Sequence, residues 1–224
     1  MSTRNIREFK SVNDLKDKYQ KRCNKMTGEV WRFDRKDNKI RAQAFVEEIK
    51  ELINGKFVFE VGCHEGDVLY EFSKYASKVV SIELNEEPAL VAKGRQYECD
   101  AIVEHGDAIR YLQENRDVVP DVFYSWSNVG GTEWWIQQIL ELRGETSPTI
   151  ITGISLMPQT GGFEPPYEWG ASGWKNPLQV IDAKKLQEKY GGRFVHATFE
   201  LPPGSPCSLG MFGALVMEGK KNGV

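Results

Sequence analysis

The chain has 224 residues and a formal net charge of −3 at pH 7. A chain of this length can bury a substantial core as one domain, and its weak negative charge provides no overall basic field for nucleic acid or anionic membrane. The four cysteines have no paired spacing, so neither a zinc motif nor a disulfide framework is indicated. The amino terminus is charged and no apolar run reaches membrane-spanning length, so we expect no secretory signal, no membrane partner and a cytoplasmic location.

Residues 1–55 are predicted to form a charged, helical amino-terminal extension. A first helix is predicted to run toward Lys25, and apolar residues at helical spacing predict a second helix over about 40–53. We expect this extension to pack on the edge of a sheet. The alternative is that the segment 28–35 closes over a bound ligand and caps the site.

Strand and helix patterns alternate between residues 56 and 156. Alternation at these lengths predicts a mostly parallel sheet with right-handed crossovers and helices on both faces. A first strand begins at Phe57, and further strands are predicted at 78–84, 100–105, 118–126 and 149–156. The helices predicted between them span about 67–75, 86–97, 108–116 and 132–142.

The last third of the chain begins with a loop over 157–177 that is rich in proline, glycine and aromatic residues. A loop of this length is usually a lid or a binding loop, and its aromatic content argues against disorder. A helix over about 179–190 follows. Two strands, 193–200 and 209–218, are predicted to form a closing hairpin.

The segment 57–66, F-V-F-E-V-G-C-H-E-G, carries the main functional signal. It predicts a strand, a tight turn and a helix start, the layout of a nucleotide-binding first βα unit. Gly62 permits a turn that a Cβ would obstruct, and Gly66 permits helix, strand and ligand to approach closely. Glu83 ends the second strand about twenty residues later, where such folds place an acid that accepts hydrogen bonds from ribose hydroxyls.

Taken together, the series E-V-G-C-H-E-G, S-I-E-L, H-G-D-A and D-V-F-Y-S-W resembles the class I S-adenosylmethionine-dependent methyltransferases. The resemblance covers roughly residues 40–218 in organisation. It implies a methyltransferase core over 56–224, with a Rossmann-like seven-stranded, mostly parallel sheet and a carboxy-terminal antiparallel hairpin. It also implies S-adenosylmethionine as the cofactor and S-adenosylhomocysteine as the product. The cofactor-binding residues that it implies are Glu60, Gly62, Cys63, His64, Gly66, Glu83, Leu84, Gly106, Asp107, Ala108, Ser125 and Trp126.

In that family the first acid lies near the methionine end of the cofactor, the second holds the ribose, and the Gly-Asp-Ala loop borders the adenine. These roles carry over to Glu60, Glu83 and Asp107. Asp107 is also suited to cap the helix that follows it. The chain departs from the family pattern at His64, which stands where the turn usually has its second glycine. A dinucleotide enzyme is disfavoured because its turn reads G-x-G-x-x-G.

The predicted strand ends do not carry metal ligands. The fourth strand ends in S-W-S-N and the fifth in S-L-M, without the carboxylates that Mg²⁺ prefers. We therefore expect no metal. The sequence E-P-P-Y at 164–167 follows the fifth strand and begins with glutamate, so we interpret it as a turn of the lid rather than a nucleic-acid methyltransferase box.

Aromatic residues are the main indication of the methyl acceptor, because they stack on planar substrates or hold amines by cation–π attraction. Of Trp134 and Trp135, we expect one in the core and one at the site. The predicted substrate-binding residues are Trp126, Trp134, Phe163, Tyr167, Trp169 and Trp174. Methyl transfer depends mostly on alignment, and a base is needed only for a protonated nucleophile. The candidates for such a base are Glu133, Tyr167 and Tyr124.

We therefore expect a metal-independent methyltransferase that acts by SN2 displacement on an N or O atom of a small molecule, with no nucleic-acid partner. Two alternatives stay open. One is a protein or RNA methyltransferase, for which the basic cluster in 16–25 is the nearest contact surface. The other is a non-catalytic module that binds the cofactor. The sequence leaves the oligomeric state open.

Overall fold

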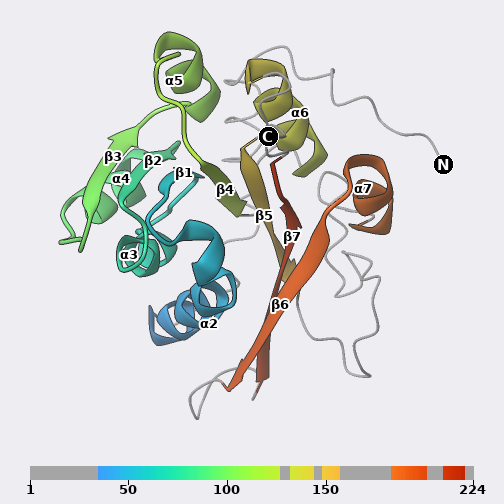
Figure 1. Ribbon diagram of the computed structural model, residues 1–224. Helices are drawn as coiled ribbons and strands as arrows, with labels where there is room; N and C mark the ends of the chain where they lie inside the picture. Colours follow the sequence, from blue (N-terminus) through green and yellow to red (C-terminus); the bar gives the residue numbers. More distant parts are fainter. Residues whose placement is uncertain (1–34, 127–131, 144–147, 157–182, 201–208, 220–224) are drawn as a thin grey trace, which may run out of the picture.

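The structure is a computed structural model that describes residues 35–126, 132–143, 148–156, 183–200 and 209–219 (Figure 1). These residues form one sheet with the strand order β3-β2-β1-β4-β5-β7-β6. Its strands are β1 (Phe57–Val61), β2 (Lys78–Glu83), β3 (Asp100–His105), β4 (Val122–Trp126), β5 (Thr149–Leu156), β6 (Arg193–Glu200) and β7 (Leu209–Met217). The helices are α2 (Arg35–Ile53), α3 (Asp67–Ser73), α4 (Glu86–Lys93), α5 (Ala108–Glu114), α6 (Thr132–Arg143) and α7 (Ala183–Tyr190).

Strands β1 to β5 pair in parallel, whereas β7 runs antiparallel to both β5 and β6. The predicted α/β architecture, with a mostly parallel sheet and a carboxy-terminal antiparallel hairpin, is confirmed. The chain lays β2 and β3 on one side of β1 and then returns to place β4 on the other side. This reversal between β1 and β4 is the switch point at which open α/β sheets bind ligands, outside the carboxyl ends of the strands.

Helices cover both faces of the sheet. Within the described residues, side chains from α2, α3 and α4 join one hydrophobic core cluster, and side chains from α5, α6 and α7 join another. Strands β1 to β5 therefore contribute apolar side chains to two layers, as buried parallel strands do. No helix in the described ranges is long and apolar enough to cross a lipid bilayer.

Helix α2 packs on a face of the sheet, and its contacts include β6, the strand at one edge. Its residues Phe45, Val46, Ile49 and Ile53 repeat at helical spacing and are at most 1 % exposed. The helix packs against α3, β6 and β7, and α2 and α3 lie side by side in Figure 1. The first predicted helix and the segment 28–35 lie outside or almost outside the described residues.

Strand β4 begins four residues later than predicted, at Val122. Pro120 has no backbone N–H for a central ladder, so the paired strand begins after it. Asp121, which directly precedes β4, is hydrogen-bonded to the first residue of β1. Its N–H donates to the carbonyl oxygen of Phe57 over 2.9 Å, and its carboxylate accepts from the N–H of Phe57 over 2.9 Å.

Candidate functional site

The carboxyl end of β1 carries a buried acid. Glu60 is 1 % exposed, and the hydroxyl of Ser81, its register partner on β2, donates to its carboxylate over 3.0 Å. Burial away from water raises the pKa of Glu60 to about 8; the Ser81 hydrogen bond opposes the rise and the nearby Glu83 carboxylate adds to it. The Glu60 carboxyl group therefore binds a proton at neutral pH.

The acid that ends β2 holds the turn that follows β1. Glu83 is buried, and its Oε2 accepts a hydrogen bond from the backbone N–H of His64 over 2.8 Å. Its Oε1 accepts from the backbone N–H and the side-chain amide of Asn85, at 2.9 and 3.0 Å. These contacts link the ends of β1 and β2 into one polar cluster.

The turn between β1 and α3 uses three left-handed residues, Gly62 (φ 76°), His64 (φ 51°) and Gly66 (φ 85°). A Cβ built at Gly62 meets no atom within 4 Å, so glycine is required there by backbone conformation and not by space. Histidine is among the residues that tolerate the left-handed region best after glycine. The departure from the family pattern at position 64 therefore leaves the turn intact.

Gly66 lies against the segment that follows α4. A Cβ built at Gly66 lies 2.8 Å from the hydroxyl oxygen of Tyr97 and 3.1 Å from the Cβ of Ala92. The absence of a side chain at Gly66 therefore permits a close approach between the start of α3 and the α4 segment, whereas the predicted approach of a strand and a ligand stays a prediction. The N–H of Gly66 closes the turn by donating to the carbonyl oxygen of Cys63 over 2.8 Å.

The carboxyl end of β3 meets the same cluster. The N–H of Gly106 donates to the carbonyl oxygen of Glu83 over 2.9 Å. Asp107 caps α5, as predicted, because its Oδ1 accepts from the N–H groups of Ile109 and Arg110 at 2.8 and 3.2 Å. The imidazole Nε2 of His105 lies 3.2 Å from the carbonyl oxygen of Leu84. The adjacent strands β1, β2 and β3 thus bring their predicted site residues together at the carboxyl end of the sheet.

The remaining cofactor candidates lie at the same level of the sheet or just beside it. Ser125 is buried and pairs in register with Val61 on β1 and Thr152 on β5. Cys63 and Ala108 are buried, and burial raises the pKa of the Cys63 thiol. Trp126 ends β4, but its side chain lies outside the described residues.

Tyr124, one of the three candidates for a base, lies in the hydrophobic core. Its ring is 1 % exposed and packs between Phe45 and Phe72, at centroid distances of 5.4 and 4.9 Å. Burial raises the pKa of Tyr124 well above its ordinary value, and the Glu60 charge adds to the rise. The structure therefore argues against Tyr124 as a catalytic base and places it in the hydrophobic core.

Glu133 joins α6 to α7. Its carboxylate lies 2.6 Å from the ammonium of Lys189 and accepts from the hydroxyl of Tyr190 over 3.3 Å. Trp135 is buried in the core and Trp134 lies partly buried against it, edge to face at 5.1 Å. The other aromatic candidates, Phe163, Tyr167, Trp169 and Trp174, lie outside the described residues. The described residues contain no group of three or more His, Cys, Asp or Glu side chains that could hold a metal ion.

Sequence reasoning missed Ser81, Arg95 and Tyr97. A serine two residues before the acid of an otherwise apolar strand is a signal that could have identified Ser81. Arg95 and Tyr97 contact the start of α3 from a segment about thirty residues away, and no local pattern predicts such a contact.

No family model and no curated protein sequence matches the chain. Solved structures do match. A cyclopropane-fatty-acyl-phospholipid synthase-like protein from Lactobacillus casei is 8 % identical, with a TM-score of 0.55 over 81 % of this chain and 91 % of that chain. A SAM-dependent methyltransferase from Geobacter sulfurreducens, in complex with S-adenosyl-L-homocysteine, is 19 % identical, with a TM-score of 0.51 over 74 % of this chain and 70 % of that chain.

The methyltransferase domain of a bacterial protein, CtHen1, is 17 % identical, with a TM-score of 0.50 over 81 % of this chain and 98 % of that chain. At these identities the similarity shows the fold. The chain has the fold of the class I S-adenosylmethionine-dependent methyltransferases.

Proposed function

We propose that this protein transfers a methyl group from S-adenosylmethionine to an N or O atom of a small molecule, without a metal ion. The observation that carries the proposal is the meeting of Glu60, Glu83 and the 62–66 turn at the carboxyl edge of the sheet, beside the switch point between β1 and β4. A fold alone does not assign an activity, whereas this arrangement provides polar groups where such sheets bind nucleosides.

Glu83 is the proposed ribose acceptor. A carboxylate offers about four acceptor positions, and the contacts with His64 and Asn85 use three of them. One position on Oε2 remains for a ribose hydroxyl. A second hydroxyl can be accepted on Oε1 when the side-chain amide of Asn85 swings away, since the backbone N–H of Asn85 keeps its own bond.

The adenine is proposed to lie beside Gly106, Asp107 and Ala108. Both capping hydrogen bonds of Asp107 go to Oδ1, so Oδ2 is the oxygen proposed to accept from the exocyclic amine of an adenine. Glu60, Gly62 and Cys63 are proposed to lie near the methionine end. Leu84, Ser125 and Trp126 complete the proposed cofactor contacts.

When bound, the cofactor supplies a sulfonium methyl group that is already activated. The nucleophile has to approach the methyl carbon from the side opposite the sulfur, so the protein mainly supplies alignment, which contributes up to roughly 7–11 kcal/mol in well-oriented reactions. Trp126, Trp134 and the aromatics of 157–177 are the proposed acceptor contacts. With Tyr124 in the core and Glu133 paired to Lys189, Tyr167 is the proposed base for an acceptor that arrives protonated.

A small-molecule acceptor is favoured by the net charge of −3, which provides no general attraction for a nucleic acid. We place the reaction in the cytoplasm, because Cys63 and Cys99 are free thiols, as is usual in a reducing compartment.

Two measurements on the full chain test the proposal. Titration calorimetry with S-adenosylmethionine and S-adenosylhomocysteine should give saturable binding of both. Incubation with methyl-labelled S-adenosylmethionine and a panel of amines, phenols and N-heterocycles, with EDTA present, should label at least one small molecule. Failure to bind either compound overturns the cofactor assignment, and transfer only to RNA or protein arms of the panel overturns the small-molecule acceptor. Binding without any transfer indicates a non-catalytic module.

A further inference from the structure

We propose that Arg95 and Tyr97, between α4 and β3, are positioning residues that hold the 62–66 turn in the shape that binds the cofactor. This inference rests on the proposed function, because the shape of the turn affects affinity only if the turn binds the cofactor. Its basis is a set of contacts that fix the start of α3 from outside the β1-α3 unit.

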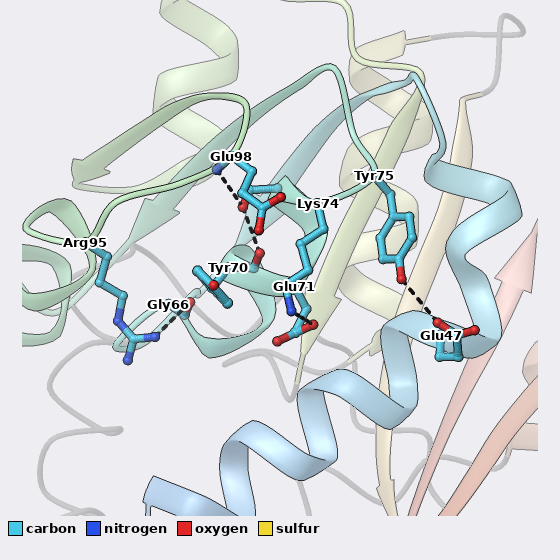
Figure 2. A network of polar contacts seen from close by, with 9 residues as sticks. Glu47, Gly66, Tyr70, Glu71, Lys74, Tyr75, Arg95 and Glu98 are labelled. Atoms are coloured by element: carbon cyan, nitrogen blue, oxygen red, sulfur yellow. Dashed lines mark hydrogen bonds and ion pairs between the residues drawn. The ribbon is translucent and has the colours of Figure 1, made fainter.

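Arg95 contacts the end of the turn and the start of α3. Its Nη1 donates to the carbonyl oxygen of Gly66 over 3.4 Å (Figure 2). The same Nη1 lies 2.9 Å from Oδ1 of Asp67, the first residue of α3. The side chains of Arg95 and Asp67 are 24 % and 15 % exposed, so water screens this pair less than a surface ion pair. The guanidinium therefore restrains both the last residue of the turn and the first residue of the helix.

Tyr97 limits the turn on its other side. Its hydroxyl donates to the carbonyl oxygen of Ala92 over 2.6 Å, which fixes the hydroxyl oxygen beside Gly66. A Cβ built at Gly66 lies only 2.8 Å from that oxygen, so the turn approaches Tyr97 this closely only because residue 66 is glycine. Burial raises the pKa of Tyr97, so the phenol keeps the proton that it donates.

The same segment also contacts the far end of α3. The N–H of Glu98 donates to the hydroxyl of Ser73 over 3.1 Å, and this hydroxyl donates to the carbonyl oxygen of Tyr70 over 2.7 Å (Figure 2). Helix α3 has seven residues, fewer than an isolated helix needs for stability in water. Its position therefore depends on contacts of this kind at both ends.

The turn is thus held from two directions. Glu83, at the end of β2, holds the N–H of His64, while Arg95 and Tyr97, after α4, hold Gly66 and Asp67. If Arg95 is lost, Glu83 and Tyr97 still restrain the turn, but Gly66 and Asp67 lose their contacts with the guanidinium. The turn then becomes fully ordered only when the cofactor binds, and the free-energy cost of this ordering lowers the affinity.

The test compares variants of the full chain in their binding of S-adenosylhomocysteine, measured by titration calorimetry. We expect Arg95→Met to weaken binding about tenfold, equivalent to ~1.4 kcal/mol, and Tyr97→Phe to weaken it about threefold. Arg95→Lys should recover part of the loss, because an ammonium can pair with Asp67 but lacks the planar fork that also reaches Gly66.

Lys74→Met is the matched control. Lys74 pairs with Glu71 over 2.6 Å near the other end of α3, and these side chains are 29 % and 12 % exposed. The control removes a comparable ion pair from the same helix without touching the turn. We expect it to lower the urea midpoint to an extent similar to Arg95→Met and to leave the affinity for S-adenosylhomocysteine unchanged.

The outcomes separate the two proposals. If the wild-type chain does not bind S-adenosylhomocysteine, the proposed function fails. If the wild type binds and Arg95→Met binds equally well, or if Lys74→Met weakens binding as much, the positioning role is overturned. Should Arg95→Met not fold, Arg95→Gln and Tyr97→Phe decide the question by the same criteria.

Discussion

The backbone N–H of His64 lies 2.8 Å from Oε2 of Glu83, so the acid that ends β2 holds the turn that follows β1. Glu83→Ala would leave this N–H and that of Asn85 without their acceptor in a partly buried region. A lost acceptor of this kind costs about 1–3 kcal/mol of unfolding free energy. We expect a destabilisation of that size in urea unfolding, together with at least a tenfold loss of affinity for S-adenosylhomocysteine.

Asp121→Ala is the control for this variant. Like Glu83, Asp121 accepts a hydrogen bond from a backbone N–H with its carboxylate. Its donor is Phe57 over 2.9 Å, at the amino-terminal end of β1 and so at the end opposite the 62–66 turn. We expect it to destabilise the fold and to leave cofactor affinity unchanged. Equal losses of affinity in both variants would show that Glu83 acts only through stability.

The buried carboxyl group of Glu60 predicts a pH-dependent stability. Its pKa is raised from 4.5 to about 8, so between these values the native chain keeps a proton that the unfolded chain has released. Stability should therefore fall as the pH rises through this window, by up to about 1.4 kcal/mol per pH unit from this group. Glu60→Gln cannot ionise, so its urea-unfolding free energy should lack this component of the slope. A slope identical to that of the wild type would contradict the raised pKa.

The cap of α5 predicts a contrast between two substitutions at one position. Asp107→Ala removes the acceptor for the N–H groups of Ile109 and Arg110 and should cost about 1 kcal/mol in unfolding free energy. Asp107→Asn keeps a capping oxygen and should restore most of that stability. If Oδ2 also accepts from the adenine amine, Asp107→Asn replaces this oxygen with an NH₂ group, which is a donor. Binding of S-adenosylhomocysteine should then weaken although the stability is near normal.

The contacts of Glu133 predict that it is not the general base. A general base contributes roughly 10²–10⁴-fold to the rate. A residue whose role is to pair two helices affects the rate only through the loss of that ion pair. We expect Glu133→Gln and Lys189→Met to have small and equal effects on kcat, because each removes the same ion pair between α6 and α7. A loss of about 10² or more in Glu133→Gln, absent from Lys189→Met, would restore Glu133 as a catalytic candidate.

The left-handed backbone of His64 predicts an unusual response to glycine. Its φ of 51° costs a side-chain-bearing residue roughly 1–2 kcal/mol, which offsets the chain entropy that glycine adds to the unfolded state. His64→Gly should therefore leave thermal stability unchanged or raise it. Glu104→Gly, on an exposed position of the extended strand β3, should lose roughly 0.5–1 kcal/mol. Equal destabilisation of the two variants would contradict the left-handed turn.

Periodicity and turn residues in the chain were sufficient to predict the order of the elements. Strands β3, β5 and β6 have the predicted bounds, and a glycine or a proline follows each of them within two residues. Helices α3, α4 and α5 end two to four residues early. At α4 the reason is local, since Gly94 has low helix propensity and the N–H of Arg95 bonds to Ala92 in a tightened last turn.

The positions of Glu60, Glu83 and Asp107 along the chain also followed from pattern, because parallel strands that end in polar residues present them at one edge of the sheet. Two facts required the packed molecule. Tyr124 looks from the sequence like a residue of the site, but its register opposite Glu60 points its ring toward α2 and α3. Arg95 and Tyr97 have no local signature, since they meet Gly66 and Asp67 from a segment about thirty residues further along the chain. Side-chain periodicity is a local property of the chain, whereas contacts across elements depend on how several elements pack together.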